Sequence, residues 1–246
     1  DLDPFNTYLN MREDIQPHNG IYLNNKKIQI LSFSPECFFK TKDSEIHSFP
    51  MKGTRPRSNN IKKDQSLLTE LSKSDKDKAE HLMIVDLMRN DLGKICKYGS
   101  INVNKLYNIN SFETVHQMVS DVYGKLDHNI KEIDIIKALF PGGSITGAPK
   151  ESAMKIIDFL ECYQRNIYTG SIGFINKRGD MNFNIAIRTM TVKNQIGYYS
   201  VGGGIVWDSD PLEEWKEAQL KSEILEPFKN NKNINIMKNI KQKASL

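Results

Sequence analysis

The chain has 246 residues, of which 39% are hydrophobic and 26% are charged, and its formal net charge is +4 at pH 7. A chain of this length can bury a substantial core, either in one large domain or in two small ones. No apolar run approaches the ~20 residues that a membrane span needs, and no charged-then-apolar leader precedes Asp1, so we expect a cytoplasmic protein that does not contact membranes.

No linker-like stretch interrupts residues 1–228, and we expect one domain there, followed by a Lys/Asn-rich tail over residues 229–246. The net positive charge falls largely on this tail, where no aromatic residues interleave, so nucleic acid is not an expected partner. Cys37, Cys96 and Cys162 leave an odd thiol and show no metal-type spacing. These features favour packing roles in a reducing compartment.

The first elements are expected to build a sheet. Residues 1–10 mix a proline with aromatic and aliphatic residues, which is typical of an entry segment packed on a sheet. Residues 21–23 and 27–33 predict a β-hairpin across Asn24 and Asn25, because their apolar residues alternate as a half-buried strand requires.

Glu36 follows this hairpin directly after a proline and precedes the apolar residues 37–39. Its carboxylate is therefore expected to be partly desolvated, which disfavours the charged form and raises the pKa. A glutamic acid with a pKa near neutral suits proton donation. A surface glutamate at a turn is the alternative.

Lys52 lies inside a short apolar run that ends in a Gly-Thr-Arg-Pro turn. Gly53 allows a backbone angle that bulkier residues resist, and Pro56 stiffens the exit, so the pair would fix where the lysine points. Taken alone, the stretch also fits a strand end with a surface lysine.

Residues 59–74 are polar, predict a short helix over 65–71, and are not expected to hold chemistry. Residues 75–92 predict a helix whose centre is apolar on nearly every face, as in a helix buried in a larger body. Glu80 and Asp86 would then need partners, because an unpaired buried carboxylate costs several kcal/mol. A hard cation is one such partner. Asp86, Arg89, Asn90 and Asp91 have the character of a structural salt-bridge and cap cluster.

Residues 100–107 and 112–123 predict strands, and His116 in the second strand has the usual interpretation of a satisfied core histidine. Helices are expected over 133–140 and 149–160, the second with a proline in its first turn. The glycine-rich loop between them would direct free N–H groups toward one point, which suits a carboxylate or a phosphate, and Ser144 adds a hydroxyl there.

A strand pair is expected over residues 168–173 and 180–189. Arg188 would lie in an apolar strand, where a guanidinium is tolerated only against an anion, and its geometry fits two-point contact with a carboxylate. A strand over 196–201 leads into three consecutive glycines from Gly202 to Gly204. Glycines in series weaken a strand, and close approach of the backbone to a ligand is the usual reason for them.

The last predicted helix begins with Asp210 as its N-cap, Pro211 at its first position and Glu213 closing a capping box, and runs toward residue 225. Glu214, Glu217 and Lys221 are spaced three and four residues apart and share one face of this helix. Surface ion pairing is the ordinary explanation for such a spacing.

Four segments carry a family resemblance when they are taken together. They are residues 49–57 with Pro-Met-Lys-Gly-Thr, residues 80–87 with Glu-His-Leu, residues 140–150 with Ser-Ile-Thr-Gly-Ala-Pro-Lys, and residues 202–206 with Gly-Gly-Gly-Ile-Val. In this order and spacing the chain resembles the chorismate-utilising enzymes from about Pro4 to about Phe228. Within that family, the lysine of the Pro-x-Lys-Gly-Thr turn is similar to the aminodeoxychorismate branch.

The resemblance implies an α+β fold in which antiparallel sheets pack face to face with helices outside, and more chain before residue 1 than is present here. It implies magnesium bound by Glu80 and Glu217 with support from Glu214. It implies catalytic roles for Lys52, Glu36 and His116. The substrate-binding positions that it implies are Gly53, Thr54, Ser144, Tyr168, Arg188, Gly202, Gly204 and Lys221.

The activity that the resemblance implies is magnesium-dependent amination of chorismate at C4, towards p-aminobenzoate and folate. The three cysteines have no glutaminase-type setting, so the ammonia would come from a separate glutamine amidotransferase subunit. Three alternatives stay open. They are amination at C2 with loss of pyruvate, as in anthranilate synthase component I, isochorismate or salicylate formation, and a basic binding protein on the same fold without turnover.

Overall fold

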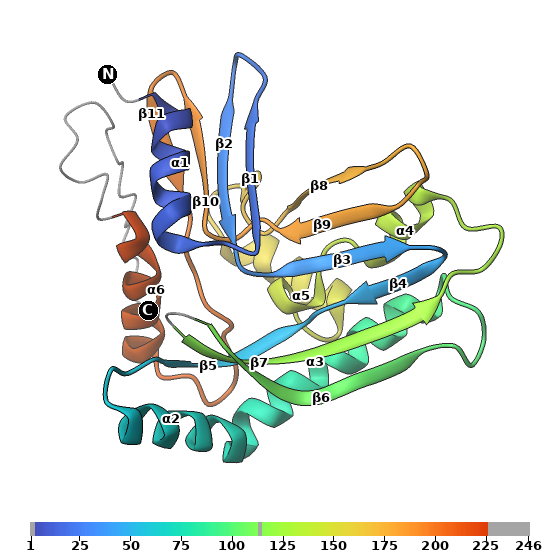
Figure 1. Cartoon of the computed structure of the whole chain (residues 1–246), viewed down its shortest axis with the longest axis horizontal. Coiled ribbons are helices and arrows are strands. Elements are labelled where there is room, and N and C mark those ends of the chain that lie inside the picture. The colour runs from blue at the N-terminus through green and yellow to red at the C-terminus, as the bar shows by residue number, and fades with distance from the viewer. Residues whose placement is uncertain (1–2, 113–114, 226–246) are drawn as a thin grey trace. The chain divides into compact units, whose positions relative to one another are not determined.

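The computed structural model describes residues 3–112 and 115–225, so the predicted tail over residues 229–246 lies outside the described residues (Figure 1). The helices are α1 (Pro4–Ile15), α2 (Ile61–Lys73), α3 (Asp75–Gly93), α4 (Glu132–Leu139), α5 (Lys150–Leu160) and α6 (Pro211–Ser222), with the 3-10 helices η1 (Gly143–Ile145) and η2 (Glu223–Leu225). The strands are β1 (Asn19–Asn24), β2 (Gln29–Ser34), β3 (Cys37–Lys42), β4 (Glu45–Ser48), β5 (Met51–Pro56), β6 (Asn102–Ser111), β7 (Val115–Lys125), β8 (Ser171–Ile175), β9 (Met181–Ile185), β10 (Thr189–Lys193) and β11 (Ile196–Tyr199).

The chain separates into two compact units. Unit 1 holds the described residues 3–35, 165–168 and 186–225, and unit 2 holds 36–112, 115–164 and 169–185. Each unit contains one antiparallel sheet with its own helices. The single domain that we expect over residues 1–228 stays a prediction.

Unit 1 is built on the four-stranded sheet β1-β2-β10-β11, with α1 packed on β1 and β2 (Figure 1). The predicted hairpin is confirmed, because β1 and β2 pair antiparallel with Asn24 opposite Gln29. Its turn is closed by the side chain of Asn25, which accepts hydrogen bonds from the backbone N–H groups of residues 27 and 28 at 3.1 and 2.7 Å.

The core of unit 1 lies between α1 and its sheet. Tyr8 and Met11 of α1 are buried there, and the Tyr8 ring stacks on Phe33 with centroids 5.3 Å apart. Burying each such side chain contributes roughly 1.5–3 kcal/mol. The expectation that residues 1–10 pack on a sheet is thus confirmed for the described residues, and they do so as a helix.

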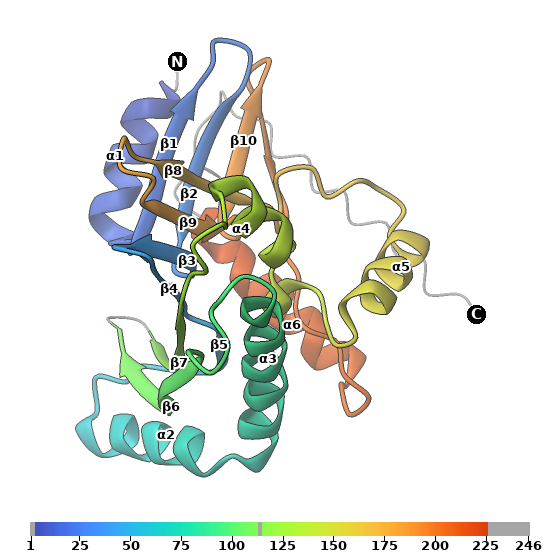
Figure 2. The same cartoon turned by 90° about the vertical axis from the view of Figure 1, so that its right-hand side faces the viewer.

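Unit 2 is built on a seven-stranded sheet with the order β5-β7-β4-β3-β9-β8, and β6 pairs with β7 outside this path. Helices α2 and α3 contact β5 and β7, so they cover one face of this sheet (Figure 2). In β7 the buried side chains of His116, Met118, Ser120 and Val122 recur at every second residue. This alternation is the period of a strand with one face against helices.

Ser74 is the N-cap of helix α3, and its side chain accepts a hydrogen bond from the Asp77 backbone N–H at 3.2 Å. The prediction that this helix is buried on nearly every face is wrong, since Leu82 and Met83 are 39% and 40% exposed. The reason is that α3 lies on one face of the sheet and turns its other side outward. Asp86 is exposed too and pairs on the surface with Arg89 at 2.9 Å, so it does not need a buried partner.

Helix α6 begins as predicted, with Asp210 accepting hydrogen bonds from two backbone N–H groups of the first turn and with Pro211 at the first position. The predicted capping box is wrong, because the Glu213 carboxylate accepts a hydrogen bond from Lys216 at 2.6 Å and serves an ion pair on the helix surface. The α-helix ends at Ser222, and η2 continues the chain for one 3-10 turn.

The three cysteines have free thiols. The packing role is confirmed for the half-buried Cys96, because a Cβ added at Gly124 would lie 2.9 Å from its sulfur. Burial raises the pKa of both the Cys37 and the Cys96 thiols to about 11. The packing role is wrong for Cys162, which is exposed. In residues 3–112 and 115–225, no helix combines the length and the apolar character needed to cross a membrane.

Candidate functional site

A polar cluster in unit 2 is centred on Glu36 and Ser144 and includes Lys52 and His81. Glu36 is 7% exposed and accepts a hydrogen bond from the Ser144 hydroxyl at 2.6 Å. Burial raises the pKa of Glu36 to about 7, while the Ser144 hydrogen bond and the charge of Lys52 lower it. The prediction of a desolvated Glu36 with a pKa near neutral is therefore confirmed.

Lys52 is half-buried on β5, at a β-bulge where the pairing with β7 shifts register between residues 52 and 54. Gly53 at the bulge has φ +70, and a Cβ there would lie 2.9 Å from Leu71 Cδ1. A bulge re-aims the side chains around it. Gly53 thus serves the backbone turn that sets the direction of Lys52, while Thr54 is exposed on the same strand.

His81 is a member of this cluster that the sequence reasoning missed. It is fully buried on α3, next to the half-buried Glu80, and its Nε2 lies 2.7 Å from Ser120 Oγ. Burial and, to a lesser degree, the charge of Lys52 lower its pKa to about 4, so the imidazole is neutral near pH 7. Among the described residues, its Nδ1 has no hydrogen-bond partner. The sequence signal was a histidine beside Glu80 on a helix with a buried face.

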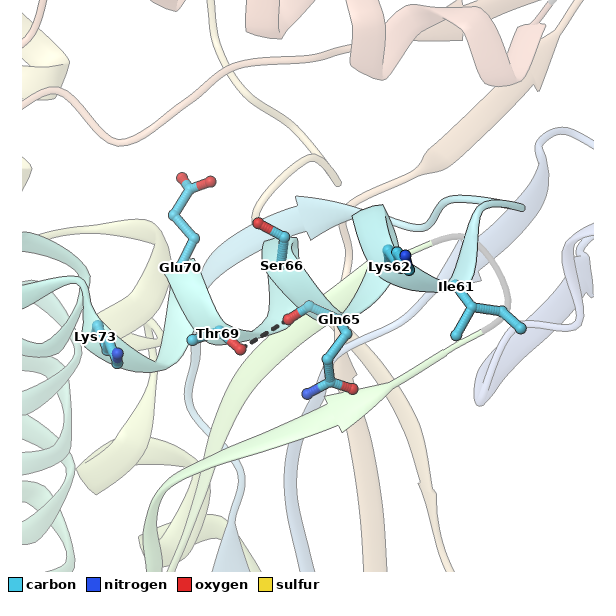
Figure 3. Close-up of a pocket in the computed structure, with 7 residues that line it drawn as sticks. All are labelled: Ile61, Lys62, Gln65, Ser66, Thr69, Glu70 and Lys73. Carbon is cyan, nitrogen blue, oxygen red and sulfur yellow. Dashed lines mark hydrogen bonds between the residues drawn. The ribbon is translucent and has the colours of Figure 1, made fainter.

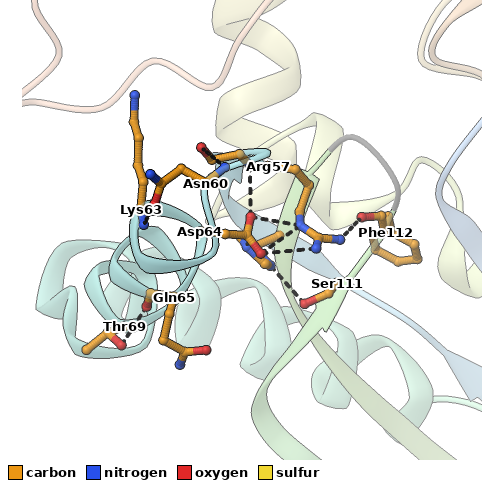
Figure 4. A network of polar contacts seen from close by, with 10 residues as sticks. Arg57, Asn60, Lys63, Asp64, Gln65, Thr69, Ser111 and Phe112 are labelled. Carbon is orange, nitrogen blue, oxygen red and sulfur yellow. Dashed lines mark hydrogen bonds and ion pairs between the residues drawn. The ribbon is translucent and has the colours of Figure 1, made fainter.

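A separate polar network links Arg57 with Asp64 and with the Phe112 carbonyl (Figure 4). His116, at the start of β7, belongs to this network. Its Nδ1 is 2.8 Å from Ser111 Oγ and its Nε2 is 3.1 Å from Asp64. Arg57 holds the same Asp64 carboxylate in two-point contact, and this contact keeps the pKa of Asp64 well below its usual range. Both ring nitrogens of the buried His116 are thus engaged, as in a satisfied core histidine, and its catalytic role stays a prediction.

The loop over residues 141–149 carries Ser144 and is held at both ends. Within it, Thr146 Oγ1 donates to the Gly142 carbonyl at 2.8 Å. After it, the Lys150 amine donates to the buried Asp91 carboxylate of α3 and to the Leu139 carbonyl of α4. Pro149 is the N-cap of α5 and precedes its first turn, contrary to the expected position inside that turn.

In unit 1, Glu214 and Glu217 on the predicted acidic face of α6 lie close to Gly203. A Cβ added at this glycine would lie 2.9 Å from Glu214 and 3.7 Å from Glu217. Glu214 accepts a hydrogen bond from Ser209 at 2.6 Å. Lys221 pairs with Glu217 and donates to the Gly202 carbonyl at 3.0 Å. The shared face is confirmed, and Gly204 follows in the exposed irregular chain after β11.

Tyr168 and Arg188 also belong to unit 1. A Cβ at Gly202 would lie 3.0 Å from the Tyr168 hydroxyl, so this tyrosine reaches the glycine segment. The prediction that Arg188 lies within a strand is wrong. It lies between β9 and β10 with φ 49, where the chain leaves the sheet of unit 2 and enters that of unit 1. Burial lowers the pKa of Arg188, while interaction with Tyr199 raises it.

The donor set that we expect for magnesium is divided between the units, with Glu214 and Glu217 in unit 1 and Glu80 in unit 2. Carboxylate oxygens suit this hard cation, and the two acids at Gly203 fit it in kind. Within the described residues, however, no three metal-ligating side chains come together, so the magnesium site stays a prediction.

An open depression lies on the outer surface of α2 (Figure 3). It is lined by Ile61, Lys62, Gln65, Ser66, Thr69, Glu70 and Lys73. All of these residues belong to one helix, and none is a predicted catalytic, substrate or metal residue. The expectation that residues 59–74 hold no chemistry stays a prediction.

Comparison with known proteins gives relatives with two names. The chain is 41% identical over 221 residues to aminodeoxychorismate synthase component 1 of Bacillus subtilis, covering 90% of this chain and 47% of that protein. It is 40% identical over 223 residues to anthranilate synthase component 1 of Saccharolobus solfataricus, covering 91% and 53%. The chain thus spans about half the length of these curated relatives.

The fold is that of solved chorismate enzymes. The crystal structure of anthranilate synthase component I from Streptococcus pneumoniae superposes with a TM-score of 0.81 at 34% identity, covering 91% of this chain and 49% of that one. This confirms the predicted α+β fold with antiparallel sheets. The family model described as chorismate binding enzyme matches residues 1–227, and the chain therefore belongs to the family of chorismate binding enzymes.

Proposed function

We propose that the chain is the chorismate-converting part of an aminodeoxychorismate synthase, which aminates chorismate at C4 to give 4-amino-4-deoxychorismate. The observation that carries the proposal is the interaction between Lys52 and the buried Glu36, whose pKa is raised to about 7. An amine and a carboxylic acid in one cluster supply a nucleophile and a proton donor. Relatives named aminodeoxychorismate synthase component 1 support the same assignment.

In this proposal the amine of Lys52 attacks C2 of chorismate after it has released its ammonium proton. A bond forms between Nζ and C2, the ring double bonds shift, and the C4–O bond breaks. Glu36 gives its proton to the departing hydroxyl, which leaves as water. Ammonia then adds at C4, the bond between Nζ and C2 breaks, and the lysine nitrogen leaves as the ring double bonds shift back. A proton from the new ammonium group at C4 returns to Glu36, which restores both residues. At pH 7 a carboxyl group with a pKa of about 7 is about half protonated, which suits a group that must give and regain a proton.

The remaining predicted residues would hold the dianionic substrate. Arg188 and Tyr168 would bind the enolpyruvyl carboxylate, since a guanidinium fits a carboxylate at two points. Lys221 and the N–H groups of Gly202 and Gly204 would bind the ring carboxylate. Gly53 and Thr54 would contact the substrate near Lys52, and His116 would act near the leaving hydroxyl or the substrate ring.

Glu80, Glu214 and Glu217 would hold magnesium, which when bound would neutralise the ring carboxylate and draw electrons from the diene. Lys221 already compensates the charge of Glu217 in the structure. We expect this pair to open when a cation and the substrate are present.

Ammonia would reach the chain from a separate glutamine amidotransferase subunit. The half-buried Cys37 and Cys96 have pKa values raised to about 11, which is the opposite of an activated thiolate. Relatives named as component 1 of their synthase agree with a partner subunit. We assign the reaction to the cytoplasm, in keeping with free thiols at all three cysteines.

The test is a product analysis with purified chain, chorismate, magnesium chloride and an ammonium salt. We expect a 4-amino product, identified by mass and by its conversion to p-aminobenzoate with an aminodeoxychorismate lyase. Lys52→Ala should lose this product. Lys42→Ala, an exposed lysine on β3, is the matched control and should retain it. Unchanged 4-amino product from Lys52→Ala would exclude the nucleophile role.

Anthranilate synthase component I is the second candidate, because the Saccharolobus relative and the Streptococcus structure carry that name. Amination at C2 releases pyruvate together with the aromatic product. A coupled lactate dehydrogenase assay detects pyruvate in the same mixture. Pyruvate formed in the absence of any lyase, with anthranilate as the aromatic product, would favour this candidate over the first.

A further inference from the structure

We propose that Ser144 is a positioning residue for Glu36, and that the ion pair between Lys150 and Asp91 holds the Ser144 loop against that carboxyl group. The inference rests on the proposed function of Glu36 as the proton donor. It extends that function to residues of α3 and α5 that do not themselves touch Glu36.

The first step is the contact between Ser144 and Glu36. The hydroxyl donates to Glu36 Oε1 at 2.6 Å, across 108 residues of sequence, inside a region where Glu36 is 7% exposed. A hydroxyl carries a single proton to donate. While that proton serves Glu36, it is not available to a substrate carboxylate, so the structure favours a role for Ser144 that differs from the expected direct substrate contact.

The second step is the effect of this bond on the acid. A hydrogen bond to the carboxylate stabilises the charged form and lowers the pKa, against the raising effect of burial. Lys52 on β5 is the charged group that acts in the same direction, and the neighbouring Cys37 has a thiol that is neutral near pH 7. Without Ser144, Glu36 would hold its proton more tightly and would be a weaker acid.

The third step is the anchor of the loop. Lys150 is the residue that follows the loop, and its amine binds both the Asp91 carboxylate and the Leu139 carbonyl at the end of α4. Asp91 is 1% exposed, and its carboxylate pairs with this amine and with the more exposed Lys94. The pair therefore joins α3 to both ends of the segment that presents Ser144.

The test follows the ionisation of Glu36 through folding stability and needs no substrate. Urea unfolding is measured from pH 4 to 9 for wild type and Glu36→Gln, and again for Ser144→Ala and the double variant. Because the pKa of Glu36 is higher in the folded than in the unfolded protein, each protein with Glu36 should lose stability relative to its Glu36→Gln partner as the pH rises from about 4.5. This loss should level off above the pKa of Glu36 in the folded protein, which is near pH 7 for wild type. With Ser144→Ala, levelling should move up by about one pH unit or more.

Two variants separate this bond from general loosening of the loop. Ser144→Thr keeps a hydroxyl and should restore the wild-type curve, while Thr146→Val removes a loop hydroxyl that bonds to Gly142 and should leave the curve unchanged. For the anchor, Lys150→Met should move the levelling point in the same direction as Ser144→Ala. Lys94→Met, which removes the exposed partner of the same Asp91, should not.

A levelling point that Ser144→Ala does not move would overturn the role of Ser144, and one that Lys150→Met does not move would overturn the anchor. The proposed function fails separately, if wild-type chain with chorismate, magnesium and ammonium gives no 4-amino product while the stability curves behave as expected.

Discussion

Glu36 is the residue whose surroundings say most about chemistry, because its raised pKa follows from observed burial and observed partners. A proton donor acts only while it is protonated. Because the pKa of Glu36 is raised to about 7, the protonated fraction falls about tenfold for each pH unit above that value.

We therefore predict that kcat/KM for chorismate amination, corrected for the fraction of free ammonia, falls above about pH 7. Glu36→Gln should lose activity on the order of 10²–10⁴-fold and should lose this decline as well. Initial rates over pH 6 to 9 measure it. A wild-type rate that stays constant to pH 9, with Glu36→Gln equally active, would remove Glu36 from the reaction.

The surroundings of His81 could not be predicted from the sequence pattern. The histidine could be seen beside Glu80, but its neutrality and its contact with Ser120 come from α3 packing on a strand 39 residues later in the chain. The Ser144 bond to Glu36 spans 108 residues and has the same origin. Local sequence predicts which residues are polar in an apolar setting, whereas tertiary packing decides which of them meet.

At the scale of elements, the bulge in β5 connects backbone conformation to the placement of Lys52. Gly53 combines a φ of +70 with close approach to Leu71 and Asp77 of the neighbouring helices. Gly99 has nearly the same angle, φ +72, but a Cβ there would have no heavy atom within 4 Å. The two glycines therefore separate the cost of the angle from the cost of the contact.

We predict that Gly99→Ala destabilises the fold by about 1 kcal/mol, the usual cost of a left-handed angle for a residue with a Cβ. Gly53→Ala should cost more, by a further 1–3 kcal/mol for overpacking against Leu71. Urea midpoints of the two variants at pH 7 provide the comparison. Equal losses for both would mean that the space around Gly53 adapts without cost and does not fix the bulge.

The elements that were predicted well are those with local chemistry. The β1–β2 hairpin is marked by alternating apolar residues and by the asparagines of its turn. Helix α6 is marked by an Asp N-cap followed by a proline at its first position. The helix α3 was placed correctly, but its burial was overestimated because an apolar composition does not say which side meets a sheet. Arg188 was assigned to a strand because its neighbours are apolar, although the chain changes sheets at that position.

At the scale of the whole molecule, the two sheets and their helices form two compact units, and the residues assigned to the reaction are divided between them. Unit 2 carries Glu36, Lys52 and Glu80, and unit 1 carries Arg188, the acids of α6 and Lys221. The resemblance to chorismate enzymes extends over both units, since the family model matches residues 1–227. Periodicity alone predicted strands and helices, and the order of motifs, not the periodicity, indicated the fold.

The central claim is that the amine of Lys52 attacks chorismate, and trapping of that adduct tests it most directly. The chain is incubated with chorismate and magnesium chloride without ammonia, digested, and analysed by mass spectrometry. We predict that the peptide containing Lys52 gains the mass of chorismate less one water, that ammonium reverses the gain, and that Lys42 stays unmodified. An unmodified Lys52 in a sample that converts chorismate normally once ammonium is added would contradict the account.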